Sequence, residues 1–298
     1  IDMNMIFTSV VGRSGQFTLA NIFNTYGIDC YAEAEPPQLI ITTSLPLKSK
    51  FINKMWGAAF TYLKLTRIQR RWLVSNEDMG RGKALEWYEK QDYTQLDRLA
   101  GRNIKRVERL QEKKKYKTYI CVSKYFLRTQ CEAIYRINPD ISLIKLTRDP
   151  LMNAKSSENR KKFFLQDNPS IHSPQNCLKM DGNQLNAFQL YLWIWCEMEL
   201  RHYRFVENHP VKKIYEINTE ELNNTSKLIE MFSCFGISHR EIKKVETLNT
   251  NVGSGRPETV ITEKDINDYE VFVKMVPKDL LNKILYLNNY DPYIHIHR

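Results

Sequence analysis

Short apolar runs rich in β-branched residues alternate along the chain with segments in which apolar residues recur every three or four positions. The first pattern is typical of strands buried in a parallel sheet, and the second is typical of helices that cover such a sheet. The predicted strands are 3–11, 28–32, 39–43, 118–123, 142–147 and 211–217. The predicted helices are 17–26, 128–137, 151–165, 185–207 and 219–235, with two more in the C-terminal part. This alternation predicts an α/β fold of three layers, with helices on both faces of a central parallel sheet.

A long charged stretch, residues 46–117, separates the third predicted strand from the fourth and contains no convincing strand. We expect a helical insertion there, within a single domain that spans residues 1–298, because no repeat or low-complexity linker marks a second domain. Basic residues cluster in this stretch between 67 and 71 and again between 102 and 117. The plainest interpretation is solvated helix faces, with the apolar residues between them turned inward.

Composition narrows the class of partner. The 298 residues carry 44 Lys and Arg against 34 Asp and Glu, and the formal net charge of +10 indicates an anionic partner. No run approaches the roughly 18 apolar residues of a membrane helix, and the first residues lack the pattern of a secretory signal. We therefore expect a soluble, cytoplasmic protein with no membrane partner. The six cysteines show no zinc-ligand spacing and are expected to be reduced thiols.

The first candidate site follows the first predicted strand. The strand ends in Gly12-Arg13-Ser14-Gly15, and Gln16-Phe17-Thr18 opens the helix. A glycine turn at a helix N-terminus presents backbone N–H groups and hydroxyls to a phosphate group. The spacing Gly-x-x-x-x-Gly-Lys-Ser/Thr is absent, which argues against a site that hydrolyses ATP or GTP. Taken alone, the turn is also compatible with an ordinary strand-to-helix connection.

The second candidate site follows the predicted strand 142–147. Arg148-Asp149-Pro150 comes directly after it, and Ser156 lies eight residues beyond the arginine. Pro150 suits the first turn of a helix, so Arg148 and Ser156 can converge on one phosphate group. The structural alternative has Asp149 as an N-cap and Arg148 in an ion pair. The occurrence of both sites in one chain is what favours a nucleotide ligand.

These residues resemble motifs of the sulfotransferases that use 3′-phosphoadenosine-5′-phosphosulfate (PAPS). Residues 12–18 are similar to their 5′-phosphosulfate loop in its Arg-Ser-Gly form, and residues 148–156 to their 3′-phosphate motif. Lys124, at the end of the predicted strand 118–123, is similar in position to the lysine of the Lys-Thr-His motif of cytosolic members. The turn Gly253-Ser254-Gly255-Arg256 is similar in position to the C-terminal loop that closes over the 3′-phosphate.

The resemblance implies a P-loop NTPase-like sulfotransferase fold with PAPS as co-substrate, its desulfated form as product, and no metal. It implies that residues 12–18 bind the 5′-phosphosulfate and that Arg148, Ser156 and the turn 253–256 bind the 3′-phosphate. It further implies that Arg13 and Lys124 are catalytic, because they neutralise charge on the oxygen that bridges phosphorus and sulfur. The charged insertion lies outside the resemblance.

The chain departs from the family pattern at the general base. Counting from Lys124, Phe126 occupies the position of the histidine, and a phenyl ring cannot accept a proton. Glu35, which precedes Pro36, is the first candidate for the base, and Glu33 is the second, although either could be a solvated loop carboxylate. His172 and His202 are kept as further candidates for the acceptor site.

The resulting hypothesis is sulfuryl transfer to a hydroxyl or amine of a small-molecule or carbohydrate acceptor, with a carboxylate as general base. A nucleic-acid-binding protein that uses its basic helices is the first alternative, although it leaves Arg148 and Ser156 unexplained. A nucleotide phosphotransferase of related fold is the second, although the expected lysine and metal-binding carboxylate are not evident. We expect no nucleic-acid partner, and the oligomeric state is left open.

Overall fold

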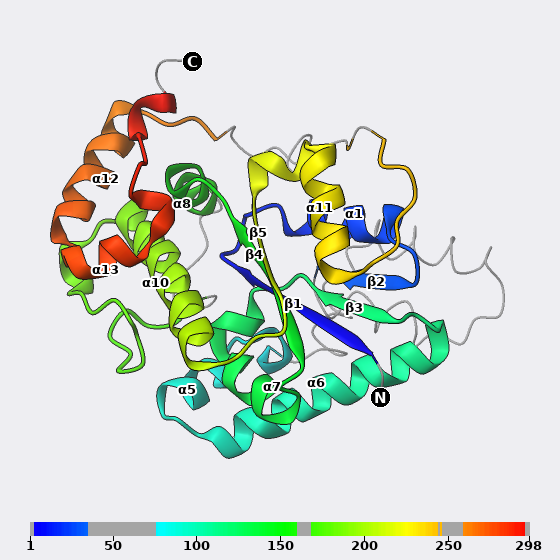
Figure 1. The fold of residues 1–298 in the computed structure, drawn as a ribbon. Coiled ribbons are helices and arrows are strands. Elements are labelled where there is room, and N and C mark those ends of the chain that lie inside the picture. Colours follow the sequence, from blue (N-terminus) through cyan, green and yellow to red (C-terminus); the bar gives the residue numbers. More distant parts are fainter. Residues whose placement is uncertain (1–2, 35–75, 160–167, 244, 246–258, 296–298) are drawn as a thin grey trace, which may run out of the picture.

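Five parallel strands form the central sheet of the computed structural model, which describes residues 3–34, 76–159, 168–243, 245 and 259–295 (Figure 1). Their order across the sheet is β2-β3-β1-β4-β5. They are β1 (Asn4–Val10), β2 (Cys30–Glu33), β3 (Thr118–Cys121), β4 (Ile141–Thr147) and β5 (Ile214–Asn218). The prediction of an α/β fold around a parallel sheet is confirmed. The strand predicted at 39–43 lies outside the described residues.

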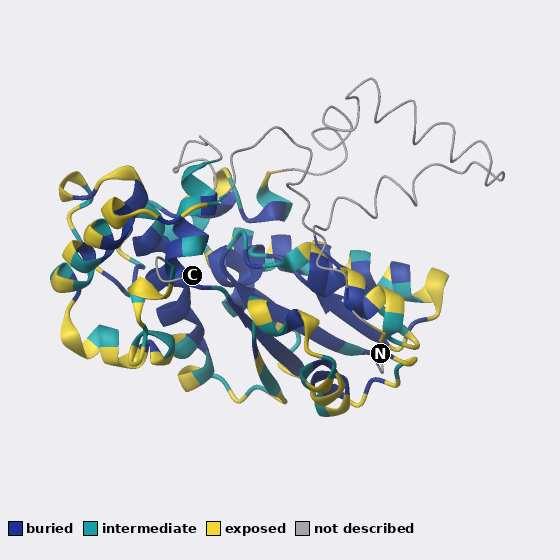
Figure 2. Ribbon diagram, turned by 90° about the horizontal axis from the view of Figure 1, so that it is seen from above, coloured by how far each residue is buried: buried dark blue, intermediate teal, exposed yellow. Residues whose placement is uncertain are grey.

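Helices cover both faces of the sheet. In β1, Met5 and Phe7 point into one apolar core, whereas Ile6 and Val10 point into the other. Successive side chains of a strand point to opposite faces, so a strand between two helical layers is apolar throughout. One layer contains α1 (Gln16–Tyr26) and α11 (Thr225–Phe235); the other contains α6 (Tyr93–Lys114), α7 (Cys131–Ile137), α10 (Ala187–Asn208) and α12 (Glu263–Met275). Figure 2 shows buried strands between helices whose outer faces are exposed.

The strand order determines where a site can form. β1 lies between β3 and β4, and all pairings are parallel, so the carboxyl ends of these three strands lie at one edge of the sheet. The segments that follow them begin at Val11, Val122 and Arg148. In open parallel sheets, ligands bind at this edge, where the chain leaves neighbouring strands in different directions.

The described part of the charged stretch, residues 76–117, is helical and contains η1 (Glu77–Met79), α5 (Lys83–Glu89) and α6. The long helix α6 buries Leu96, Ile104, Val107 and Leu110 against the sheet and exposes most of its basic residues. The basic cluster between 67 and 71 lies outside the described residues. Among those that are described, no helix is both long and apolar enough to cross a bilayer.

Several element boundaries differ from the prediction. The helix predicted at 219–235 is interrupted, because Asn224 ends η4 (Thr219–Asn223) and its side chain caps the first N–H groups of α11. The segment before α7 is a π-helix, Phe126–Gln130. After α8 (Pro150–Glu158) comes η3 (Gly182–Gln184), and after α12 come α13 (Lys278–Lys283), η5 (Leu285–Leu287) and η6 (Pro292–His295).

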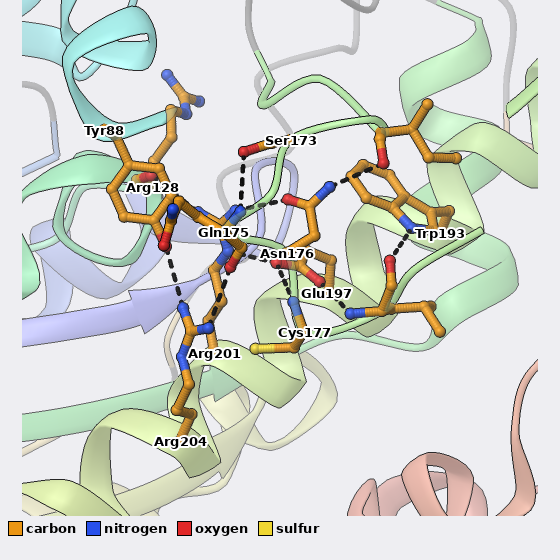
Figure 3. Close-up of polar contacts among 12 residues, drawn as sticks. Tyr88, Arg128, Ser173, Gln175, Asn176, Cys177, Trp193, Glu197, Arg201 and Arg204 are labelled. Atoms are coloured by element: carbon orange, nitrogen blue, oxygen red, sulfur yellow. Dashed lines mark hydrogen bonds and ion pairs between the residues drawn. The ribbon is translucent and has the colours of Figure 1, made fainter. Parts of the chain in front are cut away.

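A buried ion pair anchors the loop that precedes α10 (Figure 3). Arg201 Nε lies 2.6 Å from Glu197 Oε1, and the two side chains are 2% and 0% exposed. Glu197 also accepts the backbone N–H groups of Cys177 and Leu178, at 3.1 and 2.8 Å. Arg201 donates to the backbone oxygen of Arg128, at 2.9 Å. One ion pair thus joins α10 to the loop and to the π-helix after β3.

Replacing Glu197 with Ala should destabilise the fold strongly. The change leaves the Arg201 guanidinium buried without its carboxylate, and breaking a buried pair in this way typically costs about 3–5 kcal/mol. Urea unfolding monitored by circular dichroism measures the free energy of unfolding. The exposed pair Lys227–Glu230 supplies the control, because Lys227→Gln should leave the midpoint nearly unchanged. Equal, small effects of both substitutions would contradict the anchoring role.

Candidate functional site

The turn between β1 and α1 adopts an unusual backbone conformation. Arg13 and Gly15 both have left-handed φ angles, 77° and 75°. Such a conformation costs a residue with a Cβ about 1–3 kcal/mol, and it persists only where the surrounding structure imposes it. Gly15 also holds the N-cap of α1, and the first turn of this helix contains no acidic residue. The helix N-terminus therefore presents its positive end without a side-chain acceptor at the cap.

Three successive carbonyl oxygens of this turn each accept a hydrogen bond from a side chain of another element. The bonds run from Asn153 Nδ2 to Gly12 O (3.0 Å), from Arg148 Nη1 to Arg13 O (2.7 Å) and from Thr219 Oγ1 to Ser14 O (3.2 Å). In a planar trans peptide the N–H of the next residue points opposite to the carbonyl. The N–H groups of Arg13, Ser14 and Gly15 consequently point away from these side chains, as an anion-binding turn requires.

The two motifs found in the sequence contact each other directly. Arg13 Nε donates to Ser156 Oγ at 3.1 Å, and Arg148 binds the backbone of Arg13. Ser156 is buried on α8, whose N-cap is Asp149, with its carboxylate accepting from Met152 N at 2.8 Å. Asp149 thus has the N-cap role that the structural alternative gave it, and this cap places Arg148 beside the turn.

Two positively charged side chains, Arg148 and Lys124, lie beside the turn at this edge of the sheet. Burial lowers the pKa of Arg148, against the smaller raising effect of the carboxylates of Glu220 and Asp149. Lys124, which follows β3, packs on the turn: a Cβ added at Gly12 would lie 3.3 Å from Lys124 Nζ. A side chain at position 12 would therefore have to displace the flexible end of Lys124 slightly, and two cations from neighbouring strand ends flank the turn.

The remaining residues of the first motif follow the turn into α1. Thr18 is buried, Gln16 is half-buried, and Phe17 is exposed at 39%. Glu35 and the turn Gly253-Ser254-Gly255-Arg256 lie outside the described residues. Among those that are described, no cluster of three or more His, Cys, Asp or Glu side chains could hold a metal ion.

Glu33 does not lie in a solvated loop, and this expectation was wrong. β2 extends one residue further than predicted, and the Glu33 side chain, 2% exposed, lies on the sheet face that α6 covers. Both of its oxygens accept from the Arg106 guanidinium at 3.1 Å, and the Tyr119 hydroxyl donates to Oε2 at 2.6 Å. Glu33 thus joins β2 and β3 to α6 and is not available to an acceptor.

The two candidate histidines lie in different surroundings. His172 is exposed in the loop before α10, where its backbone N–H donates to Ser170 Oγ. His202 is 3% exposed on α10, with Nδ1 2.9 Å from the Ser9 hydroxyl of β1. Burial, and secondarily the charge of Lys145, lowers the pKa of His202 to about 3. His202 is therefore a neutral residue of the core that contacts β1, and its place in an acceptor site stays a prediction.

Asn153 and Thr219 were missed in the sequence, although both hold the turn. Asn153 lies one helical turn before Ser156, so the i, i+3 spacing on α8 could have placed it beside that residue. Thr219 directly follows β5 and carries no comparable signal. Its hydroxyl lies within hydrogen-bond distance of the carbonyl oxygens of both Ser14 and Thr147, at 3.2 and 3.1 Å.

Comparison with known proteins gives one named structural similarity. No family model and no curated protein matches the chain. Nine chains of solved structures match. One is described as a sulfotransferase domain from the curacin biosynthetic pathway; it is 12% identical, with a TM-score of 0.47 over 98% of this chain and 99% of that one. A similarity at this level carries no conclusion about activity, which therefore has to come from the geometry.

His202 should make stability depend on pH. Its pKa is about 3 in the folded protein and about 6.5 in the unfolded chain, so between these values unfolding takes up a proton. The free energy of unfolding therefore falls as the pH falls from 6.5, by up to about 1.4 kcal/mol per pH unit from this residue. Urea unfolding of the wild type and of His202→Gln at pH 7, 6 and 5 tests this. The difference in free energy of unfolding between the wild type and His202→Gln should become less favourable to the wild type as the pH falls from 7 to 5. A difference that stays constant with pH would contradict the assignment.

Proposed function

We propose that the protein is a sulfotransferase that moves a sulfuryl group from PAPS to a hydroxyl or amine of a small-molecule or carbohydrate acceptor. The observation that carries the proposal is the contact between the two anion-binding motifs, through Arg13 Nε and Ser156 Oγ. PAPS bears phosphate groups on two carbons of a single ribose. A protein that recognises it needs two anion sites side by side, and the contacts that join the turn after β1 to Arg148 and Ser156 support such an arrangement.

In the proposed reaction, the acceptor oxygen or nitrogen attacks sulfur, and the bond from sulfur to the 5′-phosphate oxygen breaks. The electron pair of this bond stays on the 5′-phosphate, and the acceptor proton goes to a base. Such transfers have a loose, in-line transition state, in which the protein contributes mainly position and charge. Arg13 and Lys124 would stabilise the negative charge that develops on the leaving oxygen. N–H groups of the turn and the Thr18 hydroxyl would hold the phosphate itself.

The base and the 3′-phosphate complete the proposal. Glu35 would accept the proton, which typically contributes about 10² to 10⁴ in rate. Arg148, Ser156 and Arg256 would bind the 3′-phosphate through charge-assisted hydrogen bonds, with the turn Gly253-Ser254-Gly255 closing over it. ATP lacks this phosphate, so these contacts would distinguish the donor from it.

Adenosine 3′,5′-bisphosphate should raise the melting temperature of the protein, whereas ATP and a DNA duplex should not. A ligand at 100 times its dissociation constant stabilises the folded state by about 2.7 kcal/mol. Differential scanning fluorimetry measures the shift. Ser156→Ala, which removes one proposed contact to the 3′-phosphate, should reduce it. Equal stabilisation by ATP would favour a phosphotransferase, and a shift with DNA alone would favour the nucleic-acid-binding alternative.

Replacing Arg13 with Ala should lower the rate of sulfuryl transfer by at least about 10²-fold, the usual loss on removal of one charge-stabilising group. Binding of adenosine 3′,5′-bisphosphate should stay within a few-fold of the wild type, because the backbone of the turn is retained. The assay follows radiolabelled sulfate from PAPS into pooled acceptors. Arg98→Ala, on the exposed face of α6, is the matched control and should keep full activity. An active Arg13→Ala variant would overturn the proposed role of Arg13.

A further inference from the structure

We propose that Asn153 is a positioning residue that holds the turn after β1 in its anion-binding conformation, with and without a ligand. The identity of the ligand rests on the proposed function, whereas the effect of Asn153 on the turn does not. Asn153 lies within the second motif, residues 148–156, but the sequence assigned it no role there. It lies on α8 between Arg148 and Ser156, and only 1% of its surface is exposed.

The contacts of Asn153 lie on both sides of the strained residue. Its Nδ2 is 3.0 Å from Gly12 O and 3.0 Å from Ser14 Oγ. A side-chain amide has two N–H donors, so both bonds can form at once. Arg13, with its φ of 77°, lies between the two bonded residues. Because Asn153 holds the residues before and after Arg13, the Arg13 backbone cannot relax to a negative φ. Such a change would turn the neighbouring N–H groups away from the position where an anion would bind.

The helix that carries Asn153 is itself held at several points, so it can serve as a fixed support. Lys155 Nζ lies 2.9 Å from Asp265 of α12, and α8 packs along α10. The Asp149 carboxylate at the N-cap also accepts from Tyr290 OH at 2.7 Å and lies 3.0 Å from His295 Nε2. Contacts from the C-terminal part of the chain therefore secure the first turn of α8.

Asn153 differs in charge from two other side chains that hold the turn, Arg13 and Arg148. Arg148 and Arg13 are cations, and an anionic ligand attracts both, so their contacts within the protein compete with ligand binding. Asn153 is neutral and already donates both N–H groups to the turn. Its bonds can therefore remain when a nucleotide binds, which lets it preorganise the turn, a requirement for strong anion binding.

Two nucleotides that differ at one position test this role. Adenosine 3′,5′-bisphosphate contacts the turn through its 5′-phosphate, whereas adenosine 3′-monophosphate lacks that group. In Asn153→Ala the dissociation constant of the bisphosphate should rise by about tenfold or more, since a buried carbonyl loses its donor. The dissociation constant of the 3′-monophosphate should change by less than about threefold. Isothermal titration calorimetry measures both.

Two further variants control for size and stability. Asn153→Asp keeps the shape of the side chain but places a carboxylate against Gly12 O and beside the anion, so it should weaken bisphosphate binding more than Asn153→Ala does. Asn103→Ala removes another buried side-chain amide, which donates to Gln130 Oε1 at 2.9 Å. Both residues are distant from the turn in sequence. This variant should lower the melting temperature without changing either dissociation constant. Equal weakening of both nucleotides by Asn153→Ala would overturn the proposal.

Hydrogen exchange of the unliganded protein separates this inference from the proposed function. Amides of residues 12–18 should exchange faster in Asn153→Ala than in the wild type, with no nucleotide present, while those of α10 keep their protection. A wild type that binds neither nucleotide would defeat the proposed function, and the exchange rates would still decide the role of Asn153. Unchanged exchange in residues 12–18 would overturn that role.

Discussion

The hydrogen bonds to three successive carbonyls of the turn after β1 decide which way its N–H groups point, and the candidate site depends on them. The donors come from α8, from the end of β4 and from the start of η4. They can reach the turn because β4 lies directly beside β1 and β5 lies beyond it. The strand order thus determines the local chemistry of a four-residue turn.

Much of this arrangement could be predicted from sequence, because it follows from local patterns. The apolar residues of β1 indicate a strand covered on both faces, and the glycines, Arg148 and Ser156 stand directly after strands, at the edge where parallel sheets bind ligands. Glu33 could not be placed in this way. Its partner Arg106 lies 73 residues away, on a helix whose position over β2 is a matter of packing. His202 likewise faces Ser9 only because α10 packs across β1.

The net charge has a different meaning once burial is known. Arg106, Arg201 and Lys145 each pair with a buried or partly buried glutamate beneath the surface. These cations hold helices and strands together and add little to the attraction of a distant anion. Among the described residues, the exposed basic face of α6 and the cations around the turn are charges that a ligand or partner can meet. Formal charge alone does not distinguish these populations, because an ion pair between distant residues leaves no local pattern in the sequence.

The contacts of Tyr290 and His295 with Asp149 have a consequence for how the protein is made. During synthesis on the ribosome, β1, its turn and α8 emerge long before residues 290–295. The Asp149 carboxylate at the N-cap of α8 therefore gains these two hydrogen bonds only after residues 290–295 have left the exit tunnel. Contacts this distant in sequence form slowly, because a long loop must close first. The nascent chain would therefore be able to form its sheet before the first turn of α8 is secured.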